Sequence, residues 1–508
     1  MKNKKILNID SLSKILQKYK SKSKKIVLCH GVFDLLHIGH IKHFEEAKSL
    51  GDVLIVTVTP DQYVNKGPNR PAFKTNYRLE ALASLENIDF VSENKWPNAI
   101  NTIKKIRPDI YCKGPDYKKN EDDITGKIDE EVVAIKKIGG KIVYTSDITF
   151  SSSNILNKYT DVYSKIQKSF IKKIVHSHNF EEIKKMFDTL KKLKVLVIGE
   201  TIIDQYVFCE ALGKSNKEPV LVLRDINSEQ YAGGAAAIVR HLSNFCNSIT
   251  LLSMLGENGE YKEYLTKSLP QNIKHDFIYK TDSPTIIKKR YVDHISKSKS
   301  LGVYSINDDQ LNANDEKILK QKISKLIPKH DVVIVSDYGH GFISENIAKH
   351  ISNASKFMSL NAQVNASNIG YHTMDKYKKV DCVIINENEL RHELRDKHKT
   401  VKVLMNKLAK KVNFKNLVVT KGRDGAILYN KKSKKYYECP AFASKVVDKI
   451  GSGDAMLAIL SICLRRGFEQ NFSLLLGSLA AAQSVETIGN KIPVEKNKIL
   501  KTIQHLIK

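Results

Sequence analysis

The sequence predicts an α/β protein built from two doubly wound parallel-sheet domains. Short β-branched runs alternate with helical patterns in two separate series, which begin at Ile26-Val27-Leu28 and at Lys194-Val195-Leu196. Such alternation is typical of parallel sheets with helices on both faces. The chain has 508 residues, which exceeds the length at which a single hydrophobic core usually stops growing. We therefore expect a small domain followed by a larger one.

The strands expected in each series set the domain boundaries. In the first series they are Ile26-Val27-Leu28, Val53-Leu54-Ile55-Val56, Ile110-Tyr111-Cys112 and Ile142-Val143-Tyr144. In the second they are Lys194-Val195-Leu196-Val197-Ile198-Gly199, Asp331-Val332-Val333-Ile334-Val335, Cys382-Val383-Ile384-Ile385 and Leu417-Val418-Val419-Thr420. Between them, residues 160–193 lack Gly and Pro and carry apolar residues at loosely helical spacing. The sequence thus predicts domains at 1–159 and 194–508, joined by a helical linker at 160–193.

Composition and charge exclude several classes of protein. No run reaches the roughly 18 apolar residues that cross a bilayer, and the basic N-terminus lacks the apolar core of a secretory signal. We expect a cytoplasmic protein with no membrane insertion. The seven cysteines are scattered without a CxxC pair, which indicates neither a disulfide framework nor a structural zinc site. The formal charge of +28 comes mainly from Lys spread along the chain, which favours a solvated surface over nucleic-acid binding.

The first motif is Cys29-His-Gly-Val-Phe-Asp-Leu-Leu-His-Ile-Gly-His40, between the first predicted strand and a helix. This context places His37 and His40 at a helix N-terminus, where free amides and the helix dipole favour bound phosphate. Two imidazoles there can donate to the charge that grows on a transferred phosphoryl centre. An exposed helical face, or a fortuitous metal cluster that also includes His30 and His43, is the alternative interpretation.

The segment GVFDLLHIGH resembles the signature of the cytidylyltransferase-like family, over approximately residues 24–159. The resemblance implies attack by a substrate phosphate oxygen on the α-phosphorus of a nucleoside triphosphate, with release of pyrophosphate and a divalent cation on the triphosphate. It implies catalytic roles for His37, His40, Lys66 and Lys113. The residues that it places around the nucleotide are Gly31, Phe33, Gly39, Arg78, Ser151, Ser152 and Ser153.

The three serines at 151–153 depart from the family pattern, which usually reads Ser-Thr-Thr. Their hydroxyls can still cap a helix and bind phosphate, so activity is expected. The choice between ATP and CTP as nucleotidyl donor stays open.

The second motif is Gly451-Ser452-Gly453-Asp454, which runs into an apolar, helix-like stretch. Glycines there let consecutive amides converge on an anion, and Asp454 can accept a proton from an attacking hydroxyl. By itself the motif is also compatible with an ordinary turn, because Gly, Ser and Asp are common in turns.

The whole of 194–508 resembles the ribokinase-like, or PfkB, carbohydrate kinases, whose landmarks follow one another in order. The resemblance implies ATP as phosphoryl donor, Asp454 as catalytic base and a homodimer formed through this domain. Its implied substrate contacts are Asp204, Gly233, Gly234 and Asp337. Asn386 and Glu389 match the element associated with Mg²⁺, which prefers hard oxygen ligands. The implied nucleotide side comprises Thr420, Gly422, Gly425, Gly451, Ser452 and Gly453.

Two departures bear on the kinase substrate. Heptose kinases of this family usually read Gly-Gly-Ala-Ala-Asn. The corresponding stretch here, from Gly233 to Ala237, has alanine at its last position, which removes a sugar-binding amide. They also carry Asp-Pro-Lys-Gly where this chain has a neutral stretch rich in Asn361, Asn365 and Asn368. These amides either rebuild a sugar contact or form a polar loop.

Together the two resemblances imply consecutive steps, phosphorylation of a sugar and coupling of a sugar phosphate to a nucleotide. The pairing is similar to heptose kinases fused to ADP-heptose synthases that feed lipopolysaccharide assembly, with the domain order reversed. A transferase that makes a CDP-polyol beside a polyol kinase is the first alternative. A non-catalytic sugar or nucleotide sensor, or a nucleic-acid-binding protein, is the second. The full His37/His40 pair and Asp454 argue against a sensor.

Overall fold

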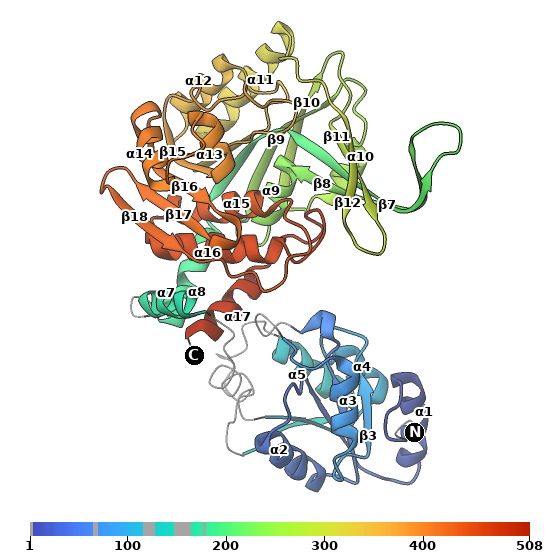
Figure 1. Ribbon diagram of the computed structural model, residues 1–508. Helices are drawn as coiled ribbons and strands as arrows, with labels where there is room; N and C mark the ends of the chain where they lie inside the picture. The colour runs from blue at the N-terminus through green and yellow to red at the C-terminus, as the bar shows by residue number, and fades with distance from the viewer. Residues whose placement is uncertain (1–3, 65–69, 115–126, 147–163, 176–178, 508) are drawn as a thin grey trace. The chain divides into compact units, whose positions relative to one another are not determined.

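The computed structural model describes residues 4–64, 70–114, 127–146, 164–175 and 179–507 (Figure 1). The chain divides into two compact units, one of residues 1–164 and 497–508 and the other of residues 165–496. Helix α17 (Lys496–Ile507) contains the division between them near the C-terminus. Among the described helices, none combines the length and the apolar character that crossing a bilayer requires.

The first unit is a five-stranded parallel sheet in the order β3-β2-β1-β4-β5. Its strands are β1 (Ile26–Gly31), β2 (Val53–Val58), β3 (Phe90–Glu93), β4 (Ile110–Lys113) and β5 (Lys141–Tyr144). Its helices are α1 (Ile9–Lys20), α2 (Ile38–Ser49), α3 (Thr75–Ala83), α4 (Ile100–Ile106) and α5 (Lys127–Lys137), with the short turn η1 (Asp61–Tyr63). The strands predicted in the first series are all present, which confirms the doubly wound parallel sheet.

Strand β1 shows why this sheet must be covered on both faces. Val27 and Cys29 lie in the apolar cluster with Phe44 of α2, whereas Ile26 and Leu28 lie in the opposite cluster. Successive side chains of a strand point to opposite faces, and a strand that is apolar at every position is buried on both. Helix layers on either side satisfy that requirement.

The order of the strands also positions a site. The first strand, β1, lies between β2 and β4, so the connections leave it in opposite directions. In open α/β sheets, ligands bind at such a switch point, beyond the carboxyl ends of the strands. Gly31 ends β1, Lys113 ends β4, and α2 begins shortly after β1.

Helix α1 precedes the first strand and was not among the predicted elements. The Asn8 side chain caps it by accepting a 2.8 Å hydrogen bond from the amide of Ser11. Leu12 and Leu16 are buried on one face of the helix. The cap residue and the apolar spacing are both visible in the sequence, so this helix could have been predicted.

The second unit is built on a nine-stranded sheet in the order β10-β9-β6-β13-β14-β15-β16-β17-β18. Its strands are β6 (Lys194–Gly199), β9 (Ser248–Gly256), β10 (Ile273–Lys280), β13 (Val332–Asp337), β14 (Met358–Ala362), β15 (Val380–Asn386), β16 (Phe414–Thr420), β17 (Ala426–Asn430) and β18 (Lys435–Cys439). Pairing is parallel except that β17 and β18 are antiparallel to their neighbours. The strands predicted in the second series are therefore confirmed.

Helices cover both faces of this sheet. They are α9 (Ala235–Leu242), α10 (Lys262–Ser268), α11 (Ala313–Leu326), α12 (Glu345–Ala354), α13 (Glu387–Leu394), α14 (Val401–Lys411), α15 (Ser452–Arg466) and α16 (Gln470–Ser484), with the short turns η4 (Ile327–Lys329) and η5 (Gly422–Asp424). The apolar α15 packs against α9 and α16 and also contacts β13 and β15. Its N-terminus is thereby fixed beside the carboxyl ends of the central strands.

A separate four-stranded sheet, which we call the lid sheet, has the order β12-β11-β7-β8. It comprises β7 (Thr201–Lys214), β8 (Leu221–Gly234), β11 (Ile287–Asp293) and β12 (Lys299–Ser305) (Figure 1). Only Glu200 separates β6 from β7, so the chain passes directly from the large sheet into the lid sheet.

Two helices stand within the stretch predicted as a helical linker, α7 (Lys165–Val175) and α8 (Phe180–Leu190). Both pack on the second unit. The Phe170 ring lies 6.4 Å from the Phe442 ring, and the Phe187 ring lies 6.2 Å from the Phe245 ring, measured between centroids. These helices thus add apolar surface to the core of that unit.

Candidate active sites

The second unit contains a cavity of about 400 Å³ that gathers most of the residues predicted for the kinase site. Those that line it are Asp204, Gly234, Asn386, Glu389, Thr420, Gly451, Ser452, Gly453 and Asp454. They come from β7, the end of β8, the ends of β15 and β16, the start of α13 and the N-terminus of α15. The predicted positions Gly233, Asp337, Gly422 and Gly425 are not among its lining residues.

Asp454 lies in the first turn of α15, where amides without helical partners point toward the cavity. The Tyr338 hydroxyl donates a 2.7 Å hydrogen bond to its Oδ1. Burial raises the pKa of Asp454 to about 7, and the hydrogen bond from Tyr338 partly opposes that rise. A carboxyl group that titrates near neutrality is well matched to general base catalysis.

Gly451 shapes the turn that leads into α15. Its φ of 85° is in the left-handed region, and a Cβ atom at this position would overlap the side chain of Asn490. Gly453, by contrast, has open space where a Cβ would lie. The first glycine is therefore required by the fold, and the second leaves room for a ligand to approach the backbone.

The lid sheet contributes the charged wall of the cavity. Nη1 of Arg290 lies 2.5 Å from Oδ1 of Asp204, and both side chains are largely buried. Lys288 is on the same face of β11, two residues earlier, and is also buried. Burial lowers the pKa of Lys288, although the neighbouring Asp204 carboxylate opposes the change. The wall thus offers one carboxylate and two cations to a polar substrate.

Sequence reasoning assigned no role to Lys288, Arg290 and Tyr338, although all three line the cavity. The run Lys288-Lys289-Arg290 in β11 was a detectable signal, because alternation along a strand places its first and third cations on one face. Tyr338 had no such signal. Its role depends on Glu200, whose carboxylate accepts the Tyr338 amide at 2.9 Å and the His340 amide at 3.0 Å.

Asp337 has a different environment from the one expected of a substrate contact. Its Oδ2 lies 2.6 Å from Nζ of Lys376 and accepts a 2.6 Å hydrogen bond from the Tyr377 hydroxyl. The residue is 1% exposed. Its carboxylate is thus engaged by protein groups, which suits a role in holding the loop that presents Tyr338.

Gly233 leaves space for the Asp204 side chain, because a Cβ at position 233 would overlap the Asp204 carboxylate. Gly422 begins the short turn η5 after β16 and Gly425 follows it, both with positive φ. At Gly425 a Cβ would overlap the Cys439 carbonyl, whereas Gly422 has open space. These glycines shape the loops around the cavity.

Asn386 and Glu389 form a capping box at the start of α13. The backbone N–H of Asn386 donates a 2.8 Å hydrogen bond to Glu389 Oε2, and the backbone N–H of Glu389 donates a 2.8 Å hydrogen bond to Asn386 Oδ1. Burial raises the pKa of Glu389 to about 7. The Asn-x-x-Glu pattern therefore has a local structural function in addition to any role toward a metal.

The asparagines in the loop after β14 stabilise the site through contacts with Tyr338. Nδ2 of Asn365 and Nδ2 of Asn368 each donate to the Tyr338 carbonyl, at 2.7 and 2.8 Å. Asn361 and Asn365 line the cavity, and Asn368 is buried. These amides thus do more than form a solvated polar loop, because they hold the tyrosine that contacts Asp454.

In the first unit, the predicted histidines lie at the start of α2. His37 is the N-cap residue, and its ring stacks on that of His40 with 3.9 Å between centroids. Phe33 is buried and meets the His40 ring edge-on at 5.6 Å. A Cβ at Gly31 would press on the Phe33 ring, so this glycine lets the aromatic ring support the histidine pair. Gly39 lies between the two histidines in the first turn.

Lys113 ends β4 at the switch point and is buried. Its Nζ lies 3.2 Å from Oε2 of Glu131, which also accepts a 2.8 Å hydrogen bond from the Tyr111 hydroxyl. Burial, reinforced by the charge of Lys113, lowers the pKa of both His30 and His43 to about 4. These two imidazoles are neutral at physiological pH.

Arg78 uses its guanidinium within the protein. It donates to the carbonyls of Val32, Thr59 and Phe73 at 2.6 to 2.9 Å, and its Nη2 lies 2.6 Å from Oδ1 of Asp61. With these contacts Arg78 holds together the loops that follow β1 and β2. Lys66 and the serines at 151–153 lie outside the residues that the structure describes.

A cavity of about 460 Å³ in this unit has a different location. Its lining includes residues 6–9 and 93–95, together with Pro60, Gln62 and Leu79. None of the described residues predicted for the transferase site is in that lining. The stacked histidines at the switch point, where the fold places ligands, define the candidate site instead.

The fold and these two sites define a protein with two phosphate-handling α/β units. The chain belongs to the pfkB family of carbohydrate kinases, whose pattern matches residues 192–497. Residues 28–159 match the Cytidylyltransferase-like family. Both resemblances inferred from the motifs are thereby confirmed.

Several curated relatives share one name. The "Bifunctional protein HldE" of Methylobacillus flagellatus is 36% identical over 157 residues, which are 30% of this chain and 31% of the relative. That of Campylobacter jejuni is 24% identical over 307 residues, which are 60% of this chain and 63% of the relative. Each of these matches spans less than two thirds of the relative's own length.

Solved structures support the fold of the second unit. Phosphofructokinase-2 from Escherichia coli in complex with potassium aligns with a TM-score of 0.51 and 14% identity, over 62% of this chain and 100% of that one. At this level of identity the likeness shows a shared fold. It confirms the ribokinase-like architecture expected from the order of the motifs.

Proposed function

We propose that this chain is a bifunctional enzyme of nucleotide-activated sugar synthesis. Its second unit phosphorylates a hydroxyl of a heptose-like sugar or sugar phosphate with ATP. Its first unit transfers a nucleotidyl group from a nucleoside triphosphate to a sugar phosphate and releases pyrophosphate. The observation that carries the proposal is Asp454 at a helix N-terminus, in one cavity with Asp204.

In the kinase reaction, Asp454 accepts the proton of the attacking sugar hydroxyl. The amides at the start of α15 stabilise charge on the transferred phosphoryl group, as helix N-termini do for anions. Asp204 orients the sugar by accepting hydrogen bonds from its hydroxyls. Lys288 and Arg290 give the same wall an affinity for a negatively charged substituent, which favours a sugar phosphate over a free sugar.

The donors at Asn386 and Glu389 fit Mg²⁺, because both offer the oxygen ligands that it prefers. The capping box uses one oxygen of each, but a carboxylate oxygen has a further lone pair with which it can accept a second partner. Bound there directly or through water, the cation would neutralise charge on the ATP phosphates.

In the transferase reaction, the protein supplies alignment and positive charge and no covalent nucleophile. His37 and His40 donate to the α-phosphate at the N-terminus of α2, and Lys113 lies at the neighbouring strand end. Lys66 and the serines at 151–153 complete the proposed phosphate contacts. The donor is ATP or CTP, bound with a divalent cation.

Reciprocal variants test the two activities in the full chain. Asp454→Asn should lower sugar phosphorylation by about 10²- to 10⁴-fold, the usual contribution of a general base, and leave pyrophosphate release unchanged. The double variant His37→Ala, His40→Ala should do the reverse. Loss of both activities in either folded variant would contradict independent sites.

A substrate screen distinguishes the heptose interpretation from its first alternative. Pyrophosphate release is measured with each nucleoside triphosphate against phosphorylated heptoses and phosphorylated polyols. Turnover of a heptose phosphate with ATP supports the main proposal. Turnover of a polyol phosphate with CTP supports a CDP-polyol enzyme with a polyol kinase.

We also propose that the chain is a cytoplasmic homodimer that pairs through the lid sheet. Leu301 and Val303 lie on the same face of the edge strand β12 and are 54% and 50% exposed. Apolar residues along an unpaired strand edge are a common surface for association. A second copy of the chain would cover them.

A further inference from the structure

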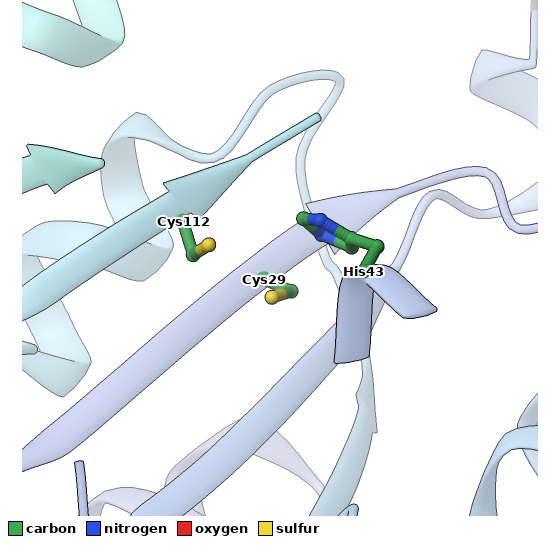
Figure 2. A group of neighbouring side chains, drawn as sticks. All are labelled: Cys29, His43 and Cys112. Atoms are coloured by element: carbon green, nitrogen blue, oxygen red, sulfur yellow. The ribbon is translucent and has the colours of Figure 1, made fainter. Parts of the chain in front are cut away.

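Two cysteines and a histidine meet in the interior of the first unit, outside the transferase site described above (Figure 2). Cys29 belongs to β1, His43 to α2 and Cys112 to β4. One ligand atom from each lies within 4.8 Å of the other two. Nothing in the sequence pairs His43 with the two cysteines, because the three residues are far apart in the chain and follow no ligand spacing.

The sheet itself brings the two sulfurs together. Cys29 and Cys112 are register partners in the parallel pair β1 and β4, so their side chains point to the same face. Both cysteines are fully buried, beneath α2. Their position is set by the backbone of two adjacent strands and does not depend on a flexible loop.

A hydrogen bond outside the group orients the imidazole. His43 Nδ1 lies 3.0 Å from the Thr145 hydroxyl, which in turn donates to the Lys113 carbonyl at 3.4 Å. When the hydroxyl donates to the carbonyl, it accepts a proton from Nδ1. Nε2 then carries the lone pair. Histidine ligands of metals are commonly held in this way, with the second nitrogen donating to a fixed partner.

The dimensions suit a metal ion. Zinc binds cysteine sulfur at about 2.3 Å and histidine nitrogen at about 2.0 Å, so two ligand atoms of one ion are at most about 4.6 Å apart. The observed limit of 4.8 Å is close enough that small side-chain rotations bring all three atoms into range. Thiolate and imidazole donors select soft or borderline ions such as Zn²⁺ over Mg²⁺.

We propose that Cys29, His43 and Cys112 bind a single thiophilic cation of the Zn²⁺ class. Two thiolates balance the charge of a divalent ion, so the filled site is neutral in the apolar core. His43 as a whole residue is less buried than the two cysteines, so the ion, and a water molecule as fourth ligand, would approach from the side of α2. The bound ion links β1 to α2, which His37 caps and which contains His40, and to β4, which ends at Lys113.

Cobalt is the probe, because thiolate ligation gives Co²⁺ an intense charge-transfer absorption that other protein ligands do not produce. The full chain, reduced and freed of metal with a chelator, is titrated with Co²⁺ and then with Zn²⁺. We expect one equivalent of Co²⁺ to produce the thiolate band and Zn²⁺ to remove it. Absence of the band in folded protein would overturn the proposal.

Variants assign the ligands. Cys29→Ser and Cys112→Ser should each abolish or strongly weaken the band, and His43→Gln should weaken Co²⁺ binding. Cys382→Ser is the matched control, a buried cysteine in a strand of the other unit, and should keep the band. Retention of the band in the Cys29→Ser, Cys112→Ser double variant would refute the assignment.

Thr145→Val tests the site without touching a ligand. It keeps the shape of the side chain and removes the hydroxyl that orients His43, and such changes typically weaken metal binding by about 10- to 100-fold. Unchanged Co²⁺ affinity would contradict the proposed geometry. Circular dichroism checks that each variant is folded.

A disulfide between the register partners is the competing outcome. All seven cysteines should react as thiols when the chain is denatured without reductant after metal removal. Two missing thiols and a cross-linked peptide containing Cys29 and Cys112 would replace the metal site with a disulfide. These measurements do not use enzyme activity, so their result is independent of the proposed function.

Discussion

At the scale of single residues, the kinase site depends on a carboxylate whose protonation is set by its surroundings. Burial raises the pKa of Asp454 to about 7, and a hydrogen bond from Tyr338 limits the rise. Tyr338 is in turn held through its backbone by Glu200, Asn365 and Asn368. We therefore regard Tyr338 as a positioning residue that tunes the proposed base.

The pH dependence of the kinase follows from this pair. Only the deprotonated carboxylate can accept a proton, so kcat/KM for phosphorylation should rise with pH up to about 7 and then level off. Tyr338→Phe removes an interaction that lowers the pKa, so the acid limb should move upward by about one pH unit.

The measurement is a pH profile of the phosphorylation rate for both proteins. Tyr304→Phe is the control, because Tyr304 lines the same cavity and should leave the profile in place. An acid limb that does not move in Tyr338→Phe would show that Asp454 does not set it.

At the scale of elements, a helix N-terminus forms the centre of each proposed site. In α15 the two glycines of the loop have separable functions, since Gly451 has positive φ and a crowded Cβ position while Gly453 has open space. Glycine is thus required for the backbone conformation at position 451, and at position 453 it leaves space for the ligand.

Alanine substitutions should separate these functions. Gly451→Ala should destabilise the second unit by about 1–3 kcal/mol, because a strained φ is forced on a residue with a Cβ. Gly453→Ala should leave stability unchanged or raise it by up to about 1 kcal/mol, since alanine favours the helix. It should instead raise KM for ATP by narrowing the approach to the amides.

Denaturant unfolding and kinase assays on both variants provide the test. The prediction fails if Gly453→Ala is the less stable protein, or if it binds ATP as well as the unaltered chain does.

At the scale of the whole molecule, each unit keeps its own sheet, core and proposed site. The lid sheet takes part in both the proposed dimer contact and the kinase site. Its edge strand β12 is exposed, and Tyr304 of the same strand lines the cavity. Pairing of two copies through this strand would therefore stabilise one wall of each kinase site.

Charged substitutions on β12 should separate the copies. Leu301→Lys with Val303→Lys places like charges on the proposed contact, so we expect a monomer by light scattering coupled to size-exclusion chromatography. Ile166→Lys is the control, because Ile166 is 73% exposed on α7, outside the lid sheet, and should not change the oligomeric state. A dimer that persists in the double variant would exclude this face.

The sequence by itself determined the two parallel sheets and the position of each helix N-terminus that is proposed to bind phosphate. The reason is that strand patterning and a glycine-containing loop before a helix are local features, readable from neighbouring residues. The loop before Asp454 was readable in this way, whereas the catalytic role of Asp454 was implied by the resemblance of residues 194–508 to carbohydrate kinases. The strand predicted at 26–28, and the one predicted at 194–199 from its second residue on, are likewise apolar at consecutive positions because both faces of each sheet are buried.

Only the tertiary structure decided which charged side chains face a cavity and which serve the fold. Arg78 and Asp337 were expected to contact ligands, yet their polar atoms are engaged by loops distant in sequence. Lys288 reaches the cavity because the lid sheet brings it there, and Cys29 meets Cys112 because two strands share a register. Such contacts join residues that are remote along the chain, so no local pattern records them.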